Sequence, residues 1–464
     1  MTNNPQPGEA VIVYRGPTES RHLHAPNQEE VGAVRLTQTL KRKAADNPGQ
    51  PPSQILRAEL PLVIEGILSQ LPEREALAKA MRRERRLRLP TNPRSLQELR
   101  ELPEEFQRTL LDEKFLMYDS RDEDSEEEEG ESEDSDAEER PPRDRVLVFS
   151  TRRNIELLCR SATWFLDGTF KTAPSLFTQI FAILGLRRRN TPGGEQLAVL
   201  FVYALLTRKT SDQYAKVLRA VQGAANEYGL IECDPGRFMT DFEKAILNAC
   251  EDVYPNVEVN CCFFHFCQSM YRHIQELGLQ VTNDNPDDRT LKTRVHMLLA
   301  LAFIPIDDVR PMFRNLKTTW SEAYFKPVIQ YFGRTYVLGA PAQRNRARVE
   351  PRYPPMVWNH YAAALNGDHR TNNVSEGWHS RFQVVVGNHH PDMYSALTEL
   401  KREQADTETV ISELAMGKKV KALPKHKWVV AQQRIMNVTS EYNDYKRDDK
   451  VVDYLRTLSP IIEL

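Results

Sequence analysis

The order of apolar segments between residues 146 and 277 restricts the fold more than any other feature of the sequence. A short strand-like run and a short helix come first, and three longer β-prone runs follow, with a Pro-Gly turn between the last two. After them, short strands alternate with helices. The predicted strands are 146–149, 163–167, 177–186, 196–206, 237–240 and 257–263, and the predicted helices are 152–159, 210–230, 242–253 and 264–277. The order βββαβαβα predicts an α/β fold with a mixed sheet, antiparallel in its first half and parallel in its second.

The segments before this core differ from it in character. Residues 1–50 are rich in Pro, Asn and Gln and are predicted to be mostly disordered. Residues 51–120 are predicted to form a helical N-terminal domain, with a short helix within 103–118. Residues 121–144 form an acidic linker whose first 20 residues hold 13 acidic and 2 basic side chains, and such a run repels itself and stays disordered. Taking the −11 of this run from the net charge of −3 leaves +8 on the remainder, which suits an anionic partner.

The segments after residue 280 are predicted to be mainly helical. Residues 145–280 form the first part of the core, and 281–366 show helix after helix with few β-branched runs. Within 367–416, helices at 371–386 and 393–416 are predicted to complete the core, and the first of them carries Glu376. Residues 417–464 are predicted to be a basic C-terminal tail because of their lysines.

Composition restricts the cellular setting. No apolar stretch reaches the ~18–20 residues of a membrane-spanning helix, and the N-terminus lacks the apolar centre of a secretory signal. The six cysteines are expected to be mostly buried free thiols in a reducing compartment. The protein is therefore expected to be intracellular.

Two basic clusters have alternative interpretations. Residues 41–43 (Lys-Arg-Lys) fit a nuclear-import signal or a solvated turn. A predicted helix ends in the basic residues Arg82, Arg83, Arg85 and Arg86. Cationic side chains at a helix C-terminus favour the helix dipole, and the same side chains could contact the phosphates of DNA.

Two aspartates follow apolar strands. Asp167 ends the first long strand, and Asp241 ends the strand at 237–240. In a mixed sheet of this order the two strands can be parallel neighbours, ~4.8 Å apart, so that both carboxylates could bind one cation. Oxygen ligands favour Mg²⁺ or Mn²⁺, and two-metal phosphoryl transfer uses such bridging carboxylates. Each residue also has a structural interpretation, because Asp167-Gly168 suits a turn and Asp241 suits a helix N-terminus.

A second cluster combines thiols and imidazole. Cys262-x-x-His265 has the spacing of half a zinc site, although no second pair follows at finger-like spacing. The alternation of Cys and Phe around it also fits ordinary core packing. The sequence leaves zinc and core packing as alternatives.

Several of these strings together resemble the Mutator-like element (MULE) transposase domain. The resemblance covers about residues 145–410. The strings are Asp167-Gly168-Thr169-Phe170-Lys171 with Pro174 and Phe177, Thr240-Asp241-Phe242-Glu243, Cys262-x-x-His265, Leu299-Ala300-Leu301-Ala302-Phe303-Ile304-Pro305, Thr371-Asn372-Asn373-Val374-Ser375-Glu376-Gly377-Trp378-His379 and His390-Pro391.

The resemblance implies an RNase-H-like DDE fold with an all-helical insertion before the last acid. It implies that Asp167, Asp241 and Glu376 are the catalytic, metal-binding residues for Mg²⁺ or Mn²⁺, and the assignment of Glu376 depends on the resemblance alone. His379 is one helical turn after Glu376 and could orient that carboxylate, contact DNA or only pack. The Cys262/His265 pair matches an element of the family, and the pair is therefore expected to support the site.

The N-terminus resembles the tail of a FLYWCH-type zinc finger, through residues 11–14 and His22-x-His24. No cysteine precedes Cys159, so a tetrahedral zinc site could not close there. These residues are therefore expected to be the remnant of a finger, either because the gene model begins inside the finger or because the finger has decayed.

The sequence therefore predicts a DDE transposase or a domesticated descendant acting in the nucleus. Water would first cleave the DNA at a transposon end, and the freed 3′-hydroxyl would then attack target DNA. The expected partners are transposon-end and target DNA and a second copy of the chain, with neither a membrane nor a small-molecule cofactor. One alternative is a catalytically silent, transposase-derived DNA-binding or regulatory protein. A third is a metal-dependent nuclease of the same fold that cuts DNA without joining ends.

Overall fold

The structure of the protein is a computed structural model. It describes residues 27–47, 49–121, 144–192, 196–230, 233–279, 286–320, 322–341, 347–387, 389–420 and 426–462. By their contacts these residues form two compact units, which divide between Pro90 and Thr91 and have separate hydrophobic cores. The expected zinc-finger remnant and nearly all of the acidic run lie outside the described residues. The domain boundaries expected from the sequence stay a prediction.

The first unit is a set of short helices with its own core. Its elements are α1 (Gln28–Asp46), α2 (Pro52–Glu59), the 3₁₀ turn η1 (Leu60–Leu62), α3 (Glu65–Ser69) and α4 (Arg74–Arg86). The Asn27 side chain caps α1 by accepting the backbone N–H of Glu29 at 3.0 Å. Leu40 on α1 and Met81 on α4 are buried in the shared core. The expected disorder of residues 1–50 is therefore wrong for α1, because the packing partner that covers its apolar face comes from α4, far along the chain.

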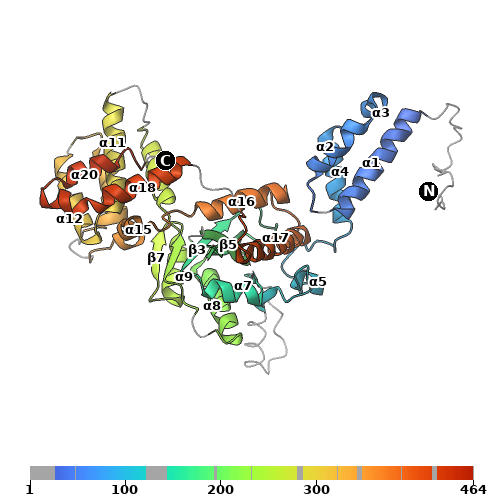
Figure 1. Ribbon diagram of the computed structural model, residues 1–464, viewed down its shortest axis with the longest axis horizontal. Coiled ribbons are helices and arrows are strands. Elements are labelled where there is room, and N and C mark those ends of the chain that lie inside the picture. The colour runs from blue at the N-terminus through green and yellow to red at the C-terminus, as the bar shows by residue number, and fades with distance from the viewer. Residues whose placement is uncertain are drawn as a thin grey trace. The chain divides into compact units, whose positions relative to one another are not determined.

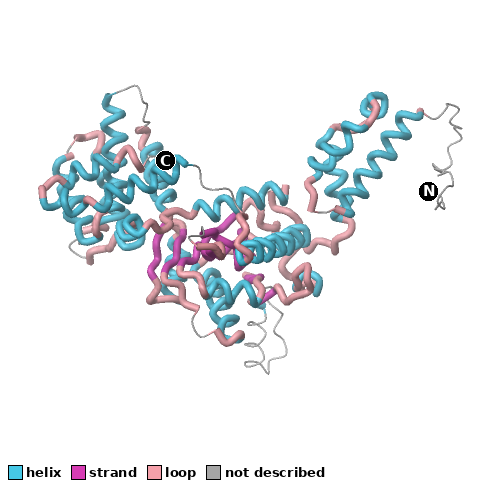
Figure 2. Tube along the Cα trace, in the orientation of Figure 1, coloured by secondary structure: helices cyan, strands magenta, loops and turns pink. Residues whose placement is uncertain are grey.

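The second unit is built around a seven-stranded mixed sheet (Figures 1 and 2). Its strands are β1 (Leu116–Asp119), β2 (Val146–Phe149), β3 (Thr163–Thr169), β4 (Gln179–Arg188), β5 (Gln196–Leu206), β6 (Arg237–Thr240) and β7 (Glu258–Cys261). The spatial order is β1-β2-β5-β4-β3-β6-β7. Strands β3, β4 and β5 pair antiparallel, whereas β3, β6 and β7 pair parallel. The predicted α/β class and the predicted change from antiparallel to parallel are confirmed, and this sheet is consistent with an RNase-H-like fold.

Strand β1 was not expected. In place of a helix within 103–118, the structure has only the single turn α5 (Glu104–Gln107) before β1, so the predicted helix is wrong beyond residue 107. β1 pairs with β2, and the acidic run stands in the sequence between these two strands. At their shared end the buried Arg145 guanidinium donates to the Asp119 carboxylate, with Nε 3.0 Å from Oδ1. A pairing between strands separated by a long polar segment leaves no local signal in the sequence.

Helices cover both faces of the sheet (Figure 1). They are α7 (Arg152–Cys159), α8 (Ser211–Glu227), α9 (Lys244–Val253), α16 (Asn373–Val386) and α17 (Met393–Ala415). α10 (Phe263–Glu276) follows β7 and packs in the helical core described below. The neighbouring residues Val202 and Tyr203 on β5 mark the two faces. Val202 packs in the core that contains α8 and α9, whereas Tyr203 contacts Trp378 of α16 and Thr407 of α17. α16 and α17 therefore lie on the face opposite to α8.

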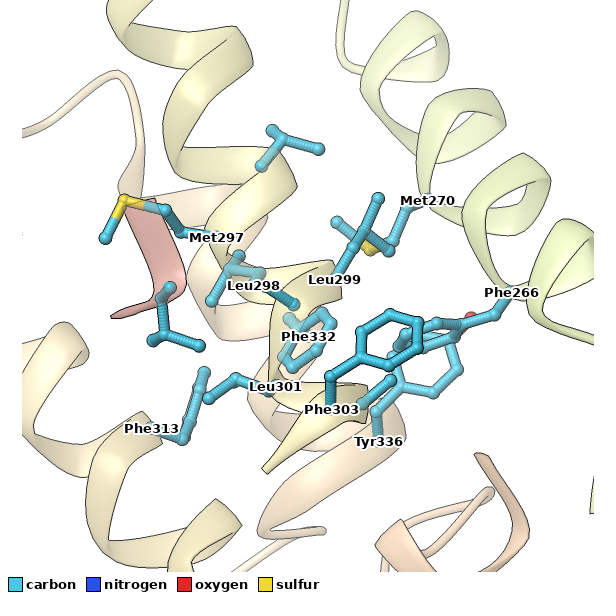
Figure 3. Packing of buried hydrophobic residues seen from close by; sticks show 14 of the residues in the cluster. Phe266, Met270, Met297, Leu298, Leu299, Leu301, Phe303, Phe313, Phe332 and Tyr336 are labelled. Carbon is cyan, nitrogen blue, oxygen red and sulfur yellow. The ribbon is translucent and has the colours of Figure 1, made fainter. Parts of the chain in front are cut away.

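A separate all-helical region packs around one large core (Figure 3). It contains α11 (Pro286–Ala300), η2 (Leu301–Phe303), α12 (Ile306–Thr319), α13 (Lys326–Phe332), the π turn η3 (Gly333–Val337), α14 (Pro355–Trp358) and α15 (Tyr361–Asn366). Aromatic side chains fill its centre, with Phe266 of α10 stacked on Trp358 at 5.0 Å between ring centroids. This region confirms the helical character predicted for 281–366.

The C-terminal segment belongs to the same core. Residues predicted to be a basic tail form α18 (His426–Ser440), α19 (Tyr442–Arg447) and α20 (Val451–Leu458). Val451, Tyr454, Leu455 and Leu458 are buried against the helical region. The predicted tail is therefore wrong over 426–458. The spacing of these four apolar residues is typical of a helix, whereas the prediction of a tail rested on the lysines.

Two of the six cysteines form a disulfide. Cys159 ends α7 and Cys233 lies shortly before β6, with 4.2 Å between their Cα atoms, whereas Cys250, Cys261, Cys262 and Cys267 are free and buried. The expectation of buried thiols is confirmed for these four and is wrong for Cys159 and Cys233. Because the partners are separated by 74 residues, only the folded sheet brings them together.

Reduction of this disulfide should lower the free energy of unfolding by about 2–4 kcal/mol, because the bond closes a long loop in the unfolded chain. Urea unfolding with and without reductant measures the difference. The double variant Cys159→Ser/Cys233→Ser should match the reduced protein and should not respond to reductant. Equal midpoints for the oxidised and reduced protein would contradict the prediction.

Candidate active site

Asp167 and Asp241 occupy matching positions on two neighbouring parallel strands. In the pairing of β3 with β6, Phe165 lies opposite Met239. Each aspartate stands two residues further along its chain: Asp167 is two residues before the end of β3, and Asp241 directly follows β6. Continued over two residues, the same register would bring the two aspartates beside each other. Neighbouring strands are ~4.8 Å apart. The parallel neighbourhood predicted from the sequence is confirmed.

Alternation along β3 decides the face on which Asp167 lies. Trp164 and Leu166 are buried in the core shared with α8 and α9. Phe165 points to the other face, where it contacts His369 edge-on at 5.6 Å between ring centroids. Asp167 is on the side of Phe165 because side chains alternate along a strand, and its side chain is only 5% exposed. The aspartate therefore faces α16, the helix that also contains Glu376.

His379 of α16 contacts the first aspartate. Its Nδ1 is 3.5 Å from Asp167 Oδ2. Burial lowers the pKa of His379 to about 4, although the charge of Asp241 opposes this shift. The imidazole is therefore neutral at ordinary pH and is close enough to both aspartates to interact with each.

His265 of α10 contacts the second aspartate. Its Nδ1 is 2.8 Å from Asp241 Oδ1. Burial alone would lower the pKa of His265, but hydrogen bonds to Asp241 and Cys262 outweigh burial and raise it to about 10. The imidazole is thus a cation held against the Asp241 carboxylate, and the Cys262-x-x-His265 spacing brings the thiol and the imidazole together at the N-terminus of α10.

Asn372 fastens α16 to the sheet, and sequence reasoning missed this residue. Its side-chain amide donates to the Leu166 carbonyl at 3.4 Å, and its backbone N–H donates to Cys262 Sγ at 3.1 Å. Its Oδ1 accepts from the hydroxyl of Ser375 at 2.5 Å. The Asn-x-x-Ser spacing at the start of a helix was the available sequence signal for this local side-chain bond. These bonds fix where α16 begins relative to the end of β3.

Glu376 lies in α16, one turn before His379. Its side chain is outside the described part of the structure. Only the backbone position of Glu376 is described: it lies in the same helix as His379, which contacts Asp167 of β3. The third carboxylate of the expected triad stays a prediction.

A cavity of about 400 Å³ opens beside Asp241. Gly168, Asp241 and His265 line it, together with the basic side chains Lys209 and Arg272. The Lys209 ammonium lies 4.1 Å from the centre of the Phe170 ring. The cavity thus combines one candidate carboxylate, Asp241, with the cationic groups of Lys209 and Arg272 and with two further acids, Glu243 and Glu276. Lys209 is ion-paired with Glu243 at 3.0 Å.

The two aspartates fit a hard divalent cation. They supply oxygen atoms from adjacent strands, which is the donor type that Mg²⁺ and Mn²⁺ prefer. Among the described side chains no group of three or more His, Cys, Asp or Glu residues forms a metal site. The fit therefore depends on the Asp167–Asp241 pair, and a third ligand from Glu376 is part of the proposal below. Cys262 and His265 have no further Cys or His ligands for zinc among the same described side chains.

The basic residues at the end of α4 have different surroundings. Arg85 donates to three backbone carbonyls at the end of α1 and beyond it, including that of Ala44 at 2.7 Å. For Arg85 the structure therefore shows a structural role, which was one of the two interpretations of these basic residues. Arg83 and Arg86 are exposed and Arg82 is half-buried, and contact of any of them with DNA stays a prediction.

Comparison with known proteins agrees with the sheet and the aspartates. Residues 163–269 match the family model for the MULE transposase domain. The matched span begins at the first residue of β3, contains Asp167 and Asp241, and ends within α10. No curated protein matches the sequence. In the described part of the chain, no helix is both long and apolar enough to cross a membrane.

The matched residues lie in the part of the chain that folds as a mixed α/β sheet. The chain carries a MULE transposase domain at residues 163–269. The match stops well before α16, so Glu376 and His379 lie outside it.

Proposed function

We propose that the protein is a MULE-like DDE transposase, or a domesticated descendant of one, that cleaves DNA in a metal-dependent reaction and transfers the strand. The observation that supports this most directly is the parallel pairing of β3 with β6, because Asp167 and Asp241 each stand two residues beyond the last printed pair, Phe165 and Met239. Two neighbouring carboxylates beside a cavity that also contains Lys209 and Arg272 suit a metal-bound phosphodiester substrate.

In this proposal Asp167, Asp241 and Glu376 bind Mg²⁺ or Mn²⁺. A bound divalent cation would neutralise charge on the phosphodiester and lower the pKa of an attacking water. The protein contributes positioning: β3 and β6 fix the two aspartates, and Asn372 fixes α16. Phosphoryl transfer depends mainly on positioning and charge neutralisation, which such an arrangement supplies.

The two histidines act as positioning residues in the same proposal. His265 and His379 each contact one aspartate, at 2.8 and 3.5 Å. Groups that hydrogen-bond to metal-binding carboxylates restrict their orientation and tune their basicity. The Cys262/His265 pair thereby supports the site without itself binding a cation.

Metal dependence tests the proposed function. The purified full chain should cleave labelled supercoiled and linear DNA with Mg²⁺ or Mn²⁺, and should lose cleavage in EDTA. Products in which a freed 3′-hydroxyl is joined to a second labelled DNA would identify a transposase, whereas cleavage without joining would identify a nuclease. DNA binding with no cleavage in any metal would overturn the catalytic proposal and favour a silent DNA-binding protein.

A further inference from the structure

A cluster of arginines lies at the end of the sheet opposite to the two aspartates. On β4, Ala182 is the partner of Asp167, and Arg187 follows five residues later, roughly 17 Å along the strand. The arginine cluster consists of Arg153 on α7, Arg160 directly after α7, Arg187 and Arg188 at the end of β4, and Arg189. It is therefore separate from the candidate active site.

Four of the five arginines in this cluster are not neutralised by described carboxylates. Within the described residues, Arg153, Arg160, Arg187 and Arg188 have no ion-pair partner, whereas the adjacent Arg152 is paired with Glu156 at 2.9 Å. Burial and the nearby charge of Arg160 lower the pKa of Arg187. Folding thus gathers cations that repel each other, and an anionic ligand would relieve this repulsion.

Four of the five arginines line a hollow. A cavity of about 670 Å³ is lined by Arg153, by residues 187–189, and by apolar side chains of α17. Its opposite wall is held in place because Asn190 donates its backbone N–H to the Leu414 carbonyl at 3.0 Å and its amide to the Ala415 carbonyl at 3.1 Å. Shortly after α17 come two exposed lysines: Lys418, which pairs with Glu413 at 3.9 Å, and Lys419. The result is a concave, basic surface on fixed elements.

We propose that the arginine cluster binds the phosphate backbone of duplex DNA. Arginine guanidinium groups donate two parallel hydrogen bonds to a phosphate, and several of them in one hollow suit a polyanion better than a single small anion. No aromatic side chain is among the described residues that line the hollow. Binding of single strands relies on aromatic side chains that stack on bases, so the lining favours the backbone of a duplex. This proposal rests on the proposed function for its ligand, DNA, but it does not require the protein to cleave DNA.

Binding of duplex DNA in EDTA tests the cluster apart from catalysis. The variant Arg187→Ala/Arg188→Ala should bind a labelled duplex about tenfold more weakly near 0.1 M salt. For this variant the slope of log K against the logarithm of the salt concentration should also be less steep by about 2, because each lost phosphate contact reduces the slope by about 0.9. The variant Arg187→Lys/Arg188→Lys should recover part of the slope.

The matched control is Arg219→Ala/Arg456→Ala, which removes the same charge from exposed arginines on α8 and α20 that are paired with Asp252 and Asp453. It should bind like the wild type. Wild-type affinity of the cluster variant, or an equal loss in the control, would overturn the proposal. Because Arg187 is half-buried, the exposed pair Arg153→Ala/Arg188→Ala should repeat the loss with an unchanged melting temperature. A wild type that binds but never cleaves would remove the catalytic proposal and leave this one standing.

Discussion

Asp167→Asn and Asp241→Asn should each reduce metal-dependent DNA cleavage by about 10³-fold or more, equivalent to about 4 kcal/mol of transition-state stabilisation. Asparagine keeps the size of aspartate and most of its hydrogen bonding, but it lacks the charge that binds a divalent cation. Both residues stand at the matched strand ends, so the two variants should be similarly impaired.

The measurement is the initial rate of cleavage of labelled DNA at saturating Mn²⁺. Asp252→Asn is the matched control, because Asp252 is exposed on α9 and pairs with the exposed Arg219. It should cleave like the wild type. Unimpaired cleavage by Asp241→Asn would rule out the proposed site, whereas unimpaired cleavage by Glu376→Gln would remove only the third ligand.

Tyr454→Ala should lower the free energy of unfolding by about 3–5 kcal/mol, the range found when a large buried aromatic residue is truncated. Tyr454 is fully buried in α20, and its hydroxyl donates to the Phe303 carbonyl across the helical core. Its ring also packs edge-on against Tyr442, with 5.1 Å between centroids. Truncation would leave both a cavity and an unpaired carbonyl.

Urea unfolding followed by circular dichroism checks this prediction. Arg456→Ala is the control on the same helix, because Arg456 is exposed and its ion pair with Asp453 contributes little to stability. If Tyr454→Ala were no less stable than Arg456→Ala, α20 would not be part of the core. The same contacts predict that a chain ending at residue 416 would expose the apolar residues around Phe303.

Local patterns predicted most of the sheet well. The apolar runs that became β3 to β7 differ from the observed strands only near their ends, because these apolar runs are bounded by turn residues or helix starts. The two aspartates were found from the same runs, since a buried strand that ends in an acid shows that acid at the sheet edge. Glu376 had no comparable local pattern, and its assignment rests on a resemblance.

The errors share a physical cause, which is dependence on partners far along the chain. α1 has a mostly polar sequence and is covered only when Leu77 and Met81 of α4 pack on it. β1 is a strand only because β2 is available to pair with it across the acidic run. Cys159 finds Cys233 through the packing of α7 near the start of β6.

The sequence by itself determined the order of strands and helices, the change from antiparallel to parallel pairing, and the positions of Asp167 and Asp241 at strand ends. These features follow from hydrophobic periodicity and turn chemistry, which act over a few residues. Only the tertiary structure decided that His265 and His379 contact these aspartates and that Asn372 anchors α16. It also decided that the C-terminal helices complete the helical core. Such contacts join residues that are distant in sequence, and their energy comes from burial and hydrogen bonding that no single segment can provide.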